Sequence, residues 1–288
     1  MNNSEITSYD GMPETAHPTG DYNEFVDRME SDLETRRRGD LPEFEAVSVA
    51  AEYFNELRQS EGEFENANAT ETGYDEQTIM KQLLLDAANL ISHDWLCGYY
   101  EHHKTASESR NHRDESRAEA MLAGKSLQEH LTDYLELFKN ERDDLLYSTL
   151  EIVMHDAQRL VTGNNQINGR ETKENRKILS GLIAEHQVLA CLREDGWPMA
   201  RYGSVKDDRY FRTDIIVPIG PWQKRETLPL QVKAELTAER LTIDRSPHHP
   251  VPVVRVPMSG KHLAFSLPDS FRGQLVRYVK HYEQSVLS

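Results

Sequence analysis

A glutamate interrupts the apolar face of a helix that the sequence predicts over residues 176–194. The apolar stripe of this helix consists of Ile178, Leu182, Leu189 and Leu192. Glu185 stands where the helical spacing would place another leucine. A carboxylate that faces a core costs several kcal/mol if it has no partner, so Glu185 should have a cation, a metal ion or a raised pKa. The alternative is a residue at the edge of the core whose carboxylate extends to water.

Two further polar features lie in or beside predicted strands. Asp214 adjoins the apolar run Ile215–Val217, although aspartate is among the poorest strand-forming residues. It either caps a turn at the strand end or has a chemical role. Farther along, the alternation of "LPLQVKAE", residues 228–235, predicts a strand with one buried face, and Gln231 and Lys233 share the opposite face. That face is either simply solvated or functional.

The charge of the chain is unevenly distributed. The 288 residues carry a net charge of −16, which would not normally indicate a protein that binds nucleic acid. Residues 1–77, however, account for −15 of this charge, whereas residues 170–288 carry +5. The C-terminal part is therefore the one expected to meet a polyanion.

The pattern of residues predicts three regions. Residues 1–76 are acidic and poor in large apolar side chains, which indicates a largely disordered segment with one short helix near 42–59. Residues 77–163 show helical periodicity throughout and predict a bundle of three helices. Residues 170–288 read as a helix, a run of short strands and a closing helix, which is an α/β unit.

The remaining composition favours a cytoplasmic protein. The two cysteines, Cys97 and Cys191, lie in helical patterns without a C-x-x-C pair, which indicates reduced thiols. The N-terminus lacks the basic start and apolar run of a signal peptide, and no stretch approaches the length of a membrane helix. We therefore expect no membrane association.

In order and setting, these features resemble the PD-(D/E)XK nuclease superfamily, the restriction-endonuclease-like fold. There a helix acid precedes a strand acid, and a hairpin returns with an acid or glutamine, any residue and lysine. Glu185, Asp214 and the triplet Gln231-Val232-Lys233 match that order over residues 172–288. Thr213 stands where the motif has proline, and Gln231 replaces a second acid. The expected fold is a mixed sheet flanked by helices, preceded by an all-α region and an acidic disordered tail.

The resemblance implies a Mg²⁺-dependent endonuclease, with Mn²⁺ as a substitute ion. Asp214 would be the main metal ligand. The other ligands from the protein would be Glu185, the Gln231 amide oxygen and the Val232 carbonyl. A hard cation prefers such oxygen ligands and helps to activate water and stabilise the phosphoryl oxygens. Lys233 would orient or deprotonate the water. Cleavage would leave 5′-phosphate and 3′-hydroxyl ends.

Substrate and partners are less defined by the sequence. We expect DNA ahead of RNA, and a basic groove could be lined by Arg201, Lys206, Arg209, Arg212, Lys224, Arg225, Arg240, Arg245 and Arg255. Two alternatives remain open. One is a nuclease fold without activity that binds DNA or serves as a scaffold. The other is an interaction protein whose 77–163 helices bind a protein partner or a second copy of the chain, joined to an unrelated α/β unit.

Overall fold

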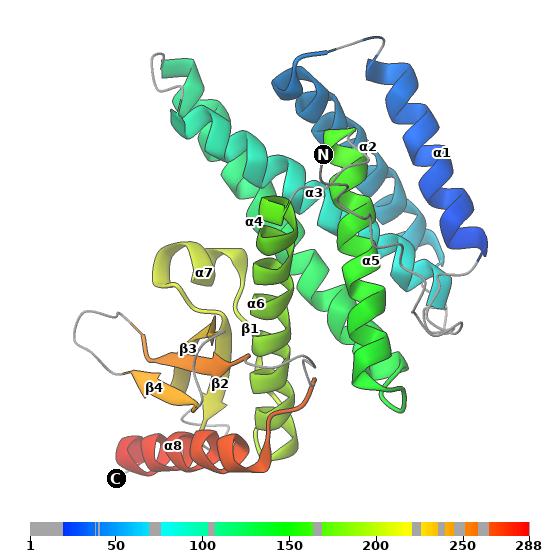
Figure 1. The fold of residues 1–288 in the computed structure, drawn as a ribbon. Coiled ribbons are helices and arrows are strands. Elements are labelled where there is room, and N and C mark those ends of the chain that lie inside the picture. Colours follow the sequence, from blue (N-terminus) through cyan, green and yellow to red (C-terminus); the bar gives the residue numbers. More distant parts are fainter. Residues whose placement is uncertain are drawn as a thin grey trace, which may run out of the picture.

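A computed structural model places a helical assembly beside a small mixed sheet (Figure 1). The described residues are 20–37, 39, 41–68, 76–102, 107–163, 169–220, 226–235, 240–244, 251–258 and 265–287. Their helices are α1 (Gly20–Arg37), α2 (Glu43–Asn68), α3 (Glu76–His102), α4 (Ser107–Leu137), α5 (Asp143–Thr162), α6 (Gly169–Glu194), α7 (Val205–Phe211) and α8 (Asp269–Leu287). Their strands are β1 (Arg201–Tyr202), β2 (Ile215–Ile219), β3 (Glu226–Glu235), β4 (Thr242–Asp244) and β5 (Val253–Pro257).

Within residues 1–76, the predicted helix near 42–59 agrees with α2, but the prediction that the rest is largely disordered is wrong for its described residues. The described residues of this segment form α1 and α2, and the side chains of Tyr22, Met29 and Phe54 are at most 1% exposed. The prediction from the acidic composition overlooked a narrow apolar stripe. Its members on α1 are Tyr22, Phe25, Val26, Met29 and Leu33. One such stripe is enough to fix a helix that packs on a larger bundle. Residues 1–19 and 69–75 lie outside the described residues.

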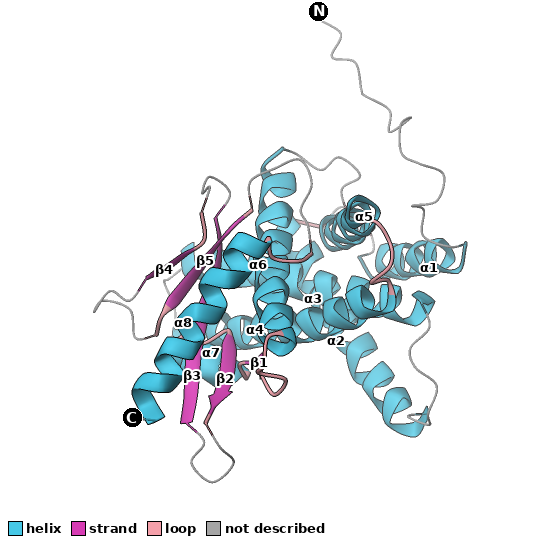
Figure 2. Ribbon diagram, turned by 90° about the horizontal axis from the view of Figure 1, so that it is seen from below, coloured by secondary structure: helices cyan, strands magenta, loops and turns pink. Residues whose placement is uncertain are grey.

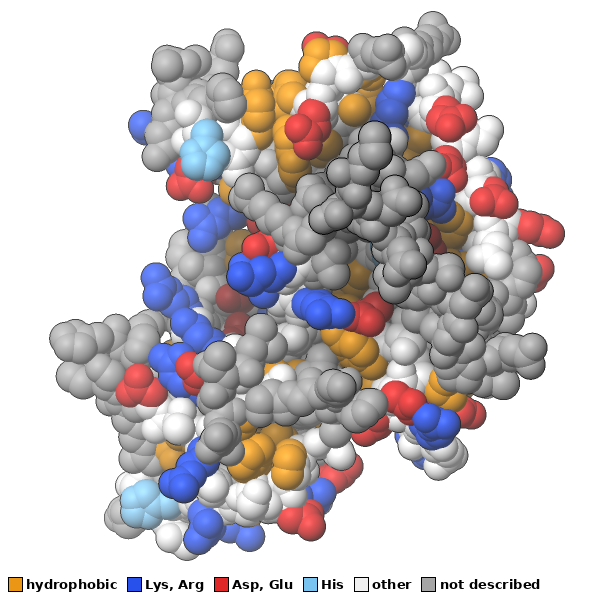
Figure 3. All heavy atoms as spheres, viewed as in Figure 1, with side chains coloured by type: hydrophobic (Ala, Val, Ile, Leu, Met, Phe, Trp, Pro, Cys, Tyr) orange, Lys and Arg blue, Asp and Glu red, His pale blue; other side chains and the backbone are white. Residues whose placement is uncertain are grey.

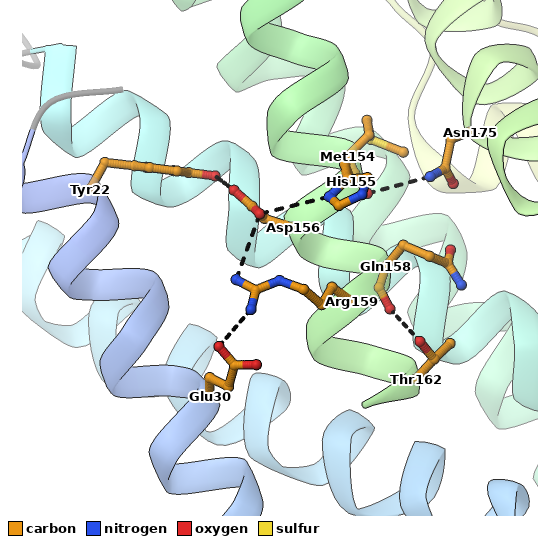
Figure 4. A network of polar contacts seen from close by, with 9 residues as sticks. All are labelled: Tyr22, Glu30, Met154, His155, Asp156, Gln158, Arg159, Thr162 and Asn175. Atoms are coloured by element: carbon orange, nitrogen blue, oxygen red, sulfur yellow. Dashed lines mark hydrogen bonds and ion pairs between the residues drawn. The ribbon is translucent and has the colours of Figure 1, made fainter. Parts of the chain in front are cut away.

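Hydrogen bonds and an ion pair connect α1 to α5 (Figure 4). The Tyr22 hydroxyl donates to Asp156 Oδ2 at 3.2 Å, and Arg159 Nη1 lies 2.5 Å from Glu30 Oε2. A neighbouring guanidinium, that of Arg37, donates to the carbonyls of the last turn of α5. These carbonyls have no partner within the helix itself, so Arg37 satisfies groups that would otherwise be left without hydrogen bonds.

The five strands form one mixed sheet in the order β1-β2-β3-β5-β4. β2 is antiparallel to both β1 and β3, β3 is parallel to β5, and β4 is antiparallel to β5. Ile215 lies opposite Leu230, and Val217 lies opposite Leu228. All four of these side chains are at most 1% exposed, so this face of the hairpin belongs to the core.

Helix α6 joins the two parts of the molecule. In both ribbon views it stands between the bundle and the sheet (Figures 1 and 2). Its buried residues, such as Leu189, belong to one apolar cluster that extends from Tyr22 on α1 to Val279 on α8. Buried residues of both 77–163 and 170–288 belong to this cluster.

Helix α8 closes the chain against the same core. Leu275 and Val279 are fully buried, and the Glu283 carboxylate accepts a hydrogen bond from the Gly220 amide at 3.4 Å, just after β2. At the other end of α8, Arg272 forms ion pairs with Glu194 and Asp195 at the end of α6. In the view from below, α8 lies in front of the strands (Figure 2).

The prediction of an α/β chain with a mixed sheet preceded by helices is confirmed at this level. The charged stretch 107–117 is the first part of α4, and residues 205–211 form the short helix α7. Among the described helices, none combines the length and apolar character needed to cross a membrane.

Candidate active site

Asp214 is fixed by the backbone on three sides, immediately before β2. Its N–H donates to the Leu230 carbonyl at 2.9 Å, and its own carbonyl accepts from the Gly203 N–H at 2.8 Å. Its Oδ2 atom accepts from the Val232 N–H at 2.7 Å. The side chain is 8% exposed. Asp214 is therefore held in one position by main-chain groups, as a preorganised ligand would be.

The chain approaches Asp214 through a strained corner. Helix α7 begins at a capping box between Ser204 and Asp207 and ends at Arg212, whose φ of 52° lies in the left-handed region. A Cβ atom on Gly203 would lie only 2.2 Å from the Thr213 carbonyl oxygen. Only glycine permits this close approach of two backbones. Such strain is often found at functional sites, where surrounding contacts hold a residue in place.

The Gln-x-Lys triplet lies opposite Asp214 on β3. Extending the β2–β3 register by one residue places Gln231 directly across from Asp214, so their side chains lie on the same face of the hairpin. Lys233 follows on that face and is exposed, whereas Val232 points into the core. The Val232 N–H faces Asp214, and the carbonyl of a strand residue points to the same edge as its N–H. The predicted carbonyl ligand is thus turned toward the predicted carboxylate ligand.

Glu185 is half-buried on α6, and its carboxylate interacts with that of Asp214. Burial, and next the charge of Asp214, raise the pKa of Glu185 well above its ordinary range. No hydrogen bond or ion pair joins Glu185 to another residue in the described part of the chain. The prediction that this acid would have a raised pKa or a bound cation agrees with its surroundings.

The pKa of Asp214 is also raised, for a similar reason. Burial is the main cause, and the charge of Asp208 adds to it. The Val232 N–H, Lys125 and Lys233 act in the opposite direction, because they stabilise the carboxylate form. The structure therefore brings Glu185, Asp214, the Gln231–Val232 segment and Lys233 into one neighbourhood.

Two charged residues of this site were not predicted from the sequence. Lys125 comes from α4, in the helical bundle, and it stabilises the charged forms of both Glu185 and Asp214. Asp208 comes from α7 and disfavours them. The Ser204-x-x-Asp207 capping signal could have indicated α7. No comparable signal exists for Lys125, whose place depends on how α4 crosses α6.

A polar network and a cavity lie beside the two carboxylates. The Tyr202 hydroxyl accepts from Gln128 Nε2 at 2.8 Å and lies 3.0 Å from Thr132 Oγ1. Burial is the main cause that raises the pKa of Tyr202 to about 12. Tyr202 and Lys125 line a cavity of about 630 Å³ between α4, α6 and the β1–α7 segment. Its other lining residues are Glu129, Thr132, Asp133, Glu136, Arg193, Arg201, Gly203, Ser204 and Val205.

Lysine and arginine side chains gather on the left-hand side of the face drawn in Figure 3, over the region of α4 and α7, with acidic side chains among them. Of the cations predicted to line a groove, Arg201, Lys206, Arg212 and Arg240 are exposed, and Arg255 is half-buried. Lys224, Arg225, Arg245 and the side chain of Arg209 lie outside the described residues. A polyanion would therefore meet exposed positive charge close to the two carboxylates.

Comparison with known proteins finds no family model, no curated protein and no solved structure that matches this chain. The site must therefore be interpreted from its own geometry. That geometry gives two interacting carboxylates, an amide and two lysines around the start of one hairpin.

The donor set suits Mg²⁺ better than a transition metal. In the described part of the chain, no three His, Cys, Asp or Glu side chains lie close enough to form a metal site on their own. Mg²⁺ does not require such a cage, because it keeps several waters and commonly takes one or two carboxylates together with substrate phosphate. Glu185 and Asp214 supply two carboxylates whose mutual repulsion a cation would relieve. The residues present fit this ion.

Proposed function

We propose that the protein is a metal-dependent nuclease of the PD-(D/E)XK superfamily that hydrolyses phosphodiester bonds, in DNA ahead of RNA. The observation that carries the proposal is the pair Glu185–Asp214. These two acids repel each other, share no ion pair with a described cation, and lie beside the Gln-x-Lys strand. Titratable groups perturbed in this way are typical of functional sites.

Mg²⁺ bound at this site would supply Lewis acidity and lower the pKa of a bound water. Asp214 and Glu185 would hold it, aided by the Gln231 amide oxygen and the Val232 carbonyl. The protein's own part is to present these oxygens from the β2–β3 hairpin and, for Glu185, from α6. The Val232 N–H and the Gly203 N–H restrict the movement of Asp214, so little reorganisation is needed when substrate binds.

Lys233 would contribute a positive charge on the exposed side of the same face. Its ammonium interacts with the Asp214 carboxylate and remains open to solvent. From this position it can donate a hydrogen bond to the attacking water or to a phosphoryl oxygen. An ammonium stabilises the developing negative charge most effectively when it is already aimed at the position where that charge appears.

The direct test is cleavage by the purified full chain of supercoiled, linear and single-stranded DNA and of RNA, with Mg²⁺, Mn²⁺ or EDTA. We expect metal-dependent cleavage that leaves 5′-phosphate ends and is abolished in Asp214→Asn and Lys233→Met. Glu45→Gln on α2 and Lys280→Met on α8 are matched controls, since both positions are exposed and lie on other helices. Activity that persists in the site variants would show that the proposal is wrong.

A second candidate is a nuclease fold that binds DNA without cleaving it. One observation favours it: Gln231 stands where a second acid would add a negative charge to the metal site. Such a protein would bind DNA with a marked dependence on salt but would show no cleavage with either metal. The same cleavage assay, combined with a binding titration, separates the two candidates.

A further inference from the structure

One face of α4 is fixed against the candidate active site. Lys125, Gln128 and Thr132 recur at three- and four-residue steps, so they lie on the same side of the helix. Gln128 Nε2 donates to the Leu182 carbonyl at 3.1 Å and to the Tyr202 hydroxyl at 2.8 Å. Thr132 Oγ1 lies 3.0 Å from that same hydroxyl. These bonds determine how α4 crosses α6 one turn before Glu185.

Lys125 lies one turn before Gln128 on this face, where α4 also contacts α7. Its side chain is half-buried, and it belongs to none of the ion pairs found among the described residues. It lines the cavity beside the carboxylates together with Tyr202 and Gly203. A half-buried ammonium without a fixed carboxylate partner is free to bind an anion from solution.

The two lysines of the site differ in what they face. Lys233 interacts with Asp214, whereas Lys125 interacts with both Asp214 and Glu185. Lys125 also lines the cavity together with Gly203, whose N–H donates to the Asp214 carbonyl at 2.8 Å. A phosphodiester that entered from the cavity would therefore meet Lys125 close to Asp214.

We propose that Lys125 is a second catalytic lysine, donated by the helical bundle, which contacts the scissile phosphate and stabilises its developing charge. The inference rests on the proposed nuclease function and extends it. In that reaction the water oxygen forms a bond to phosphorus while the P–O3′ bond breaks. The water gives up its proton to solvent, and the leaving 3′ oxygen takes one from solvent. Lys125 keeps its protons throughout and acts through charge and hydrogen bonding.

This role would also explain why the bundle and the sheet unit share one core. A bundle that only recruited partners could be attached by a flexible linker, but a bundle that supplies a catalytic group must keep a fixed position relative to the sheet. The shared apolar cluster and the hydrogen bond between Gln128 and Tyr202 fix that position. The bundle is thus a part of the active site in this account.

The test compares single-turnover cleavage by the full chain for wild type, Lys125→Met, Lys125→Arg and the exposed control Lys280→Met, at pH 7 and pH 9. Circular dichroism and thermal unfolding would establish that each variant is folded. We expect Lys125→Met to lose about 100-fold at both pH values, the effect typical of removing one preorganised donor. Lys125→Arg should recover most of that loss, and Lys280→Met should match wild type.

Three results would overturn the inference. Wild-type rates in Lys125→Met would show that the lysine has no catalytic role, while the nuclease proposal would still stand. Full recovery of Lys125→Met at pH 9 would show that Lys125 only keeps the carboxylates ionised and does not contact the phosphate. Absence of cleavage by the wild type itself would reject the nuclease function and the inference with it.

Discussion

Two buried acids in this molecule, Asp86 and Asp214, have different surroundings. Asp86, on α3 within the bundle, is 1% exposed, and its Oδ2 lies 2.7 Å from His130 Nδ1 on α4. Asp214, beside the sheet, is 8% exposed, and its carboxylate accepts a hydrogen bond from the backbone amide of Val232. Its nearest charged neighbours include two acids, Glu185 and Asp208. The first carboxylate has a histidine side chain as its partner, whereas the second has a backbone amide and a neighbouring carboxyl group.

This difference separates a structural acid from a functional one. A buried charge that is left uncompensated reduces stability, so a fold keeps such a charge only where something else makes use of it. The described part of the bundle does contain polar atoms without a hydrogen-bond partner, such as Arg58 Nη1, Asn89 Oδ1 and His93 Nδ1, but none of these belongs to a carboxylate. Burial lowers the pKa of His93 to about 4, which keeps it neutral. Burial also raises the pKa of Asp94 on α3, but among the described acids the largest rises are those of the neighbouring pair Glu185 and Asp214.

The largest effect is expected for Asp214→Asn on activity. The amide retains an acceptor for the Val232 N–H but removes the charge that would hold the metal, so cleavage should fall by about 1000-fold or more. Stability should be unchanged or slightly higher, because a buried charge has been removed. Single-turnover cleavage and urea unfolding measure the two effects. A variant that lost stability instead of activity would place Asp214 in the same class as Asp86.

Asp86→Ala should show the reverse behaviour. Removal of one partner from a buried pair leaves His130 without its carboxylate and should reduce the free energy of unfolding by about 3 kcal/mol. The fraction that remains folded should cleave at the wild-type rate. Urea unfolding followed by circular dichroism measures the loss, and Asp86→Asn, which retains an acceptor, should lose less. A loss below about 1 kcal/mol would contradict the structural role.

Gly203→Ala tests whether the backbone around Asp214 is as constrained as the geometry indicates. The new Cβ would collide with the Thr213 carbonyl, so we expect a loss of about 2 kcal/mol in stability together with reduced cleavage. Gly98→Ala on α3 is the matched control, because nothing lies within 4 Å of its added Cβ. That control should gain about 0.5 to 1 kcal/mol, as alanine favours helix over glycine. Equal effects at both positions would contradict the close-approach argument.

The smallest effect is a pH-dependent gain in Glu185→Gln. The pKa of Glu185 is raised in the folded protein, so between its ordinary pKa and the raised value the folded state binds more protons than the unfolded state. Stability contributed by this site therefore falls as pH rises through that interval. Glutamine removes the penalty, and we expect a gain of about 1 kcal/mol at pH 8 and none below pH 4. Unfolding by urea at the two pH values would show it, and an equal stability change at both would contradict the raised pKa.

The sequence predicted the parts of this molecule whose signal is local. The alternation in residues 228–235 defines β3, because one face of that strand is buried. The break in the apolar stripe at Glu185 correctly indicated an acid with unusual surroundings, since helical spacing alone places it toward the core. Asp214 was predicted to be a site residue for a similar reason, because it adjoins an apolar strand.

The features that were missed depend on tertiary packing. Helix α1 is acidic overall, and only its packing against α2, α3 and α5 shows that a single stripe of apolar residues suffices. Lys125 resembles any other lysine on a helix until the crossing of α4 over α6 is known. The electrostatic role of Asp208 likewise arises from the fold of α7 beside Asp214. Spacing along the chain carries no information about such contacts.

A calorimetric titration of Mn²⁺ into the wild-type chain, Asp214→Asn and Asp86→Asn at pH 8 tests directly whether Glu185 and Asp214 bind a metal ion. If Glu185 and Asp214 form the metal-binding pair, the wild type should bind the ion, Asp214→Asn should lose that binding, and the folded Asp86→Asn should retain it. Binding should also weaken as pH falls, because the raised pKa values of both acids favour their protonated forms. Equal Mn²⁺ binding by wild type and Asp214→Asn, or no binding by wild type, would contradict the account.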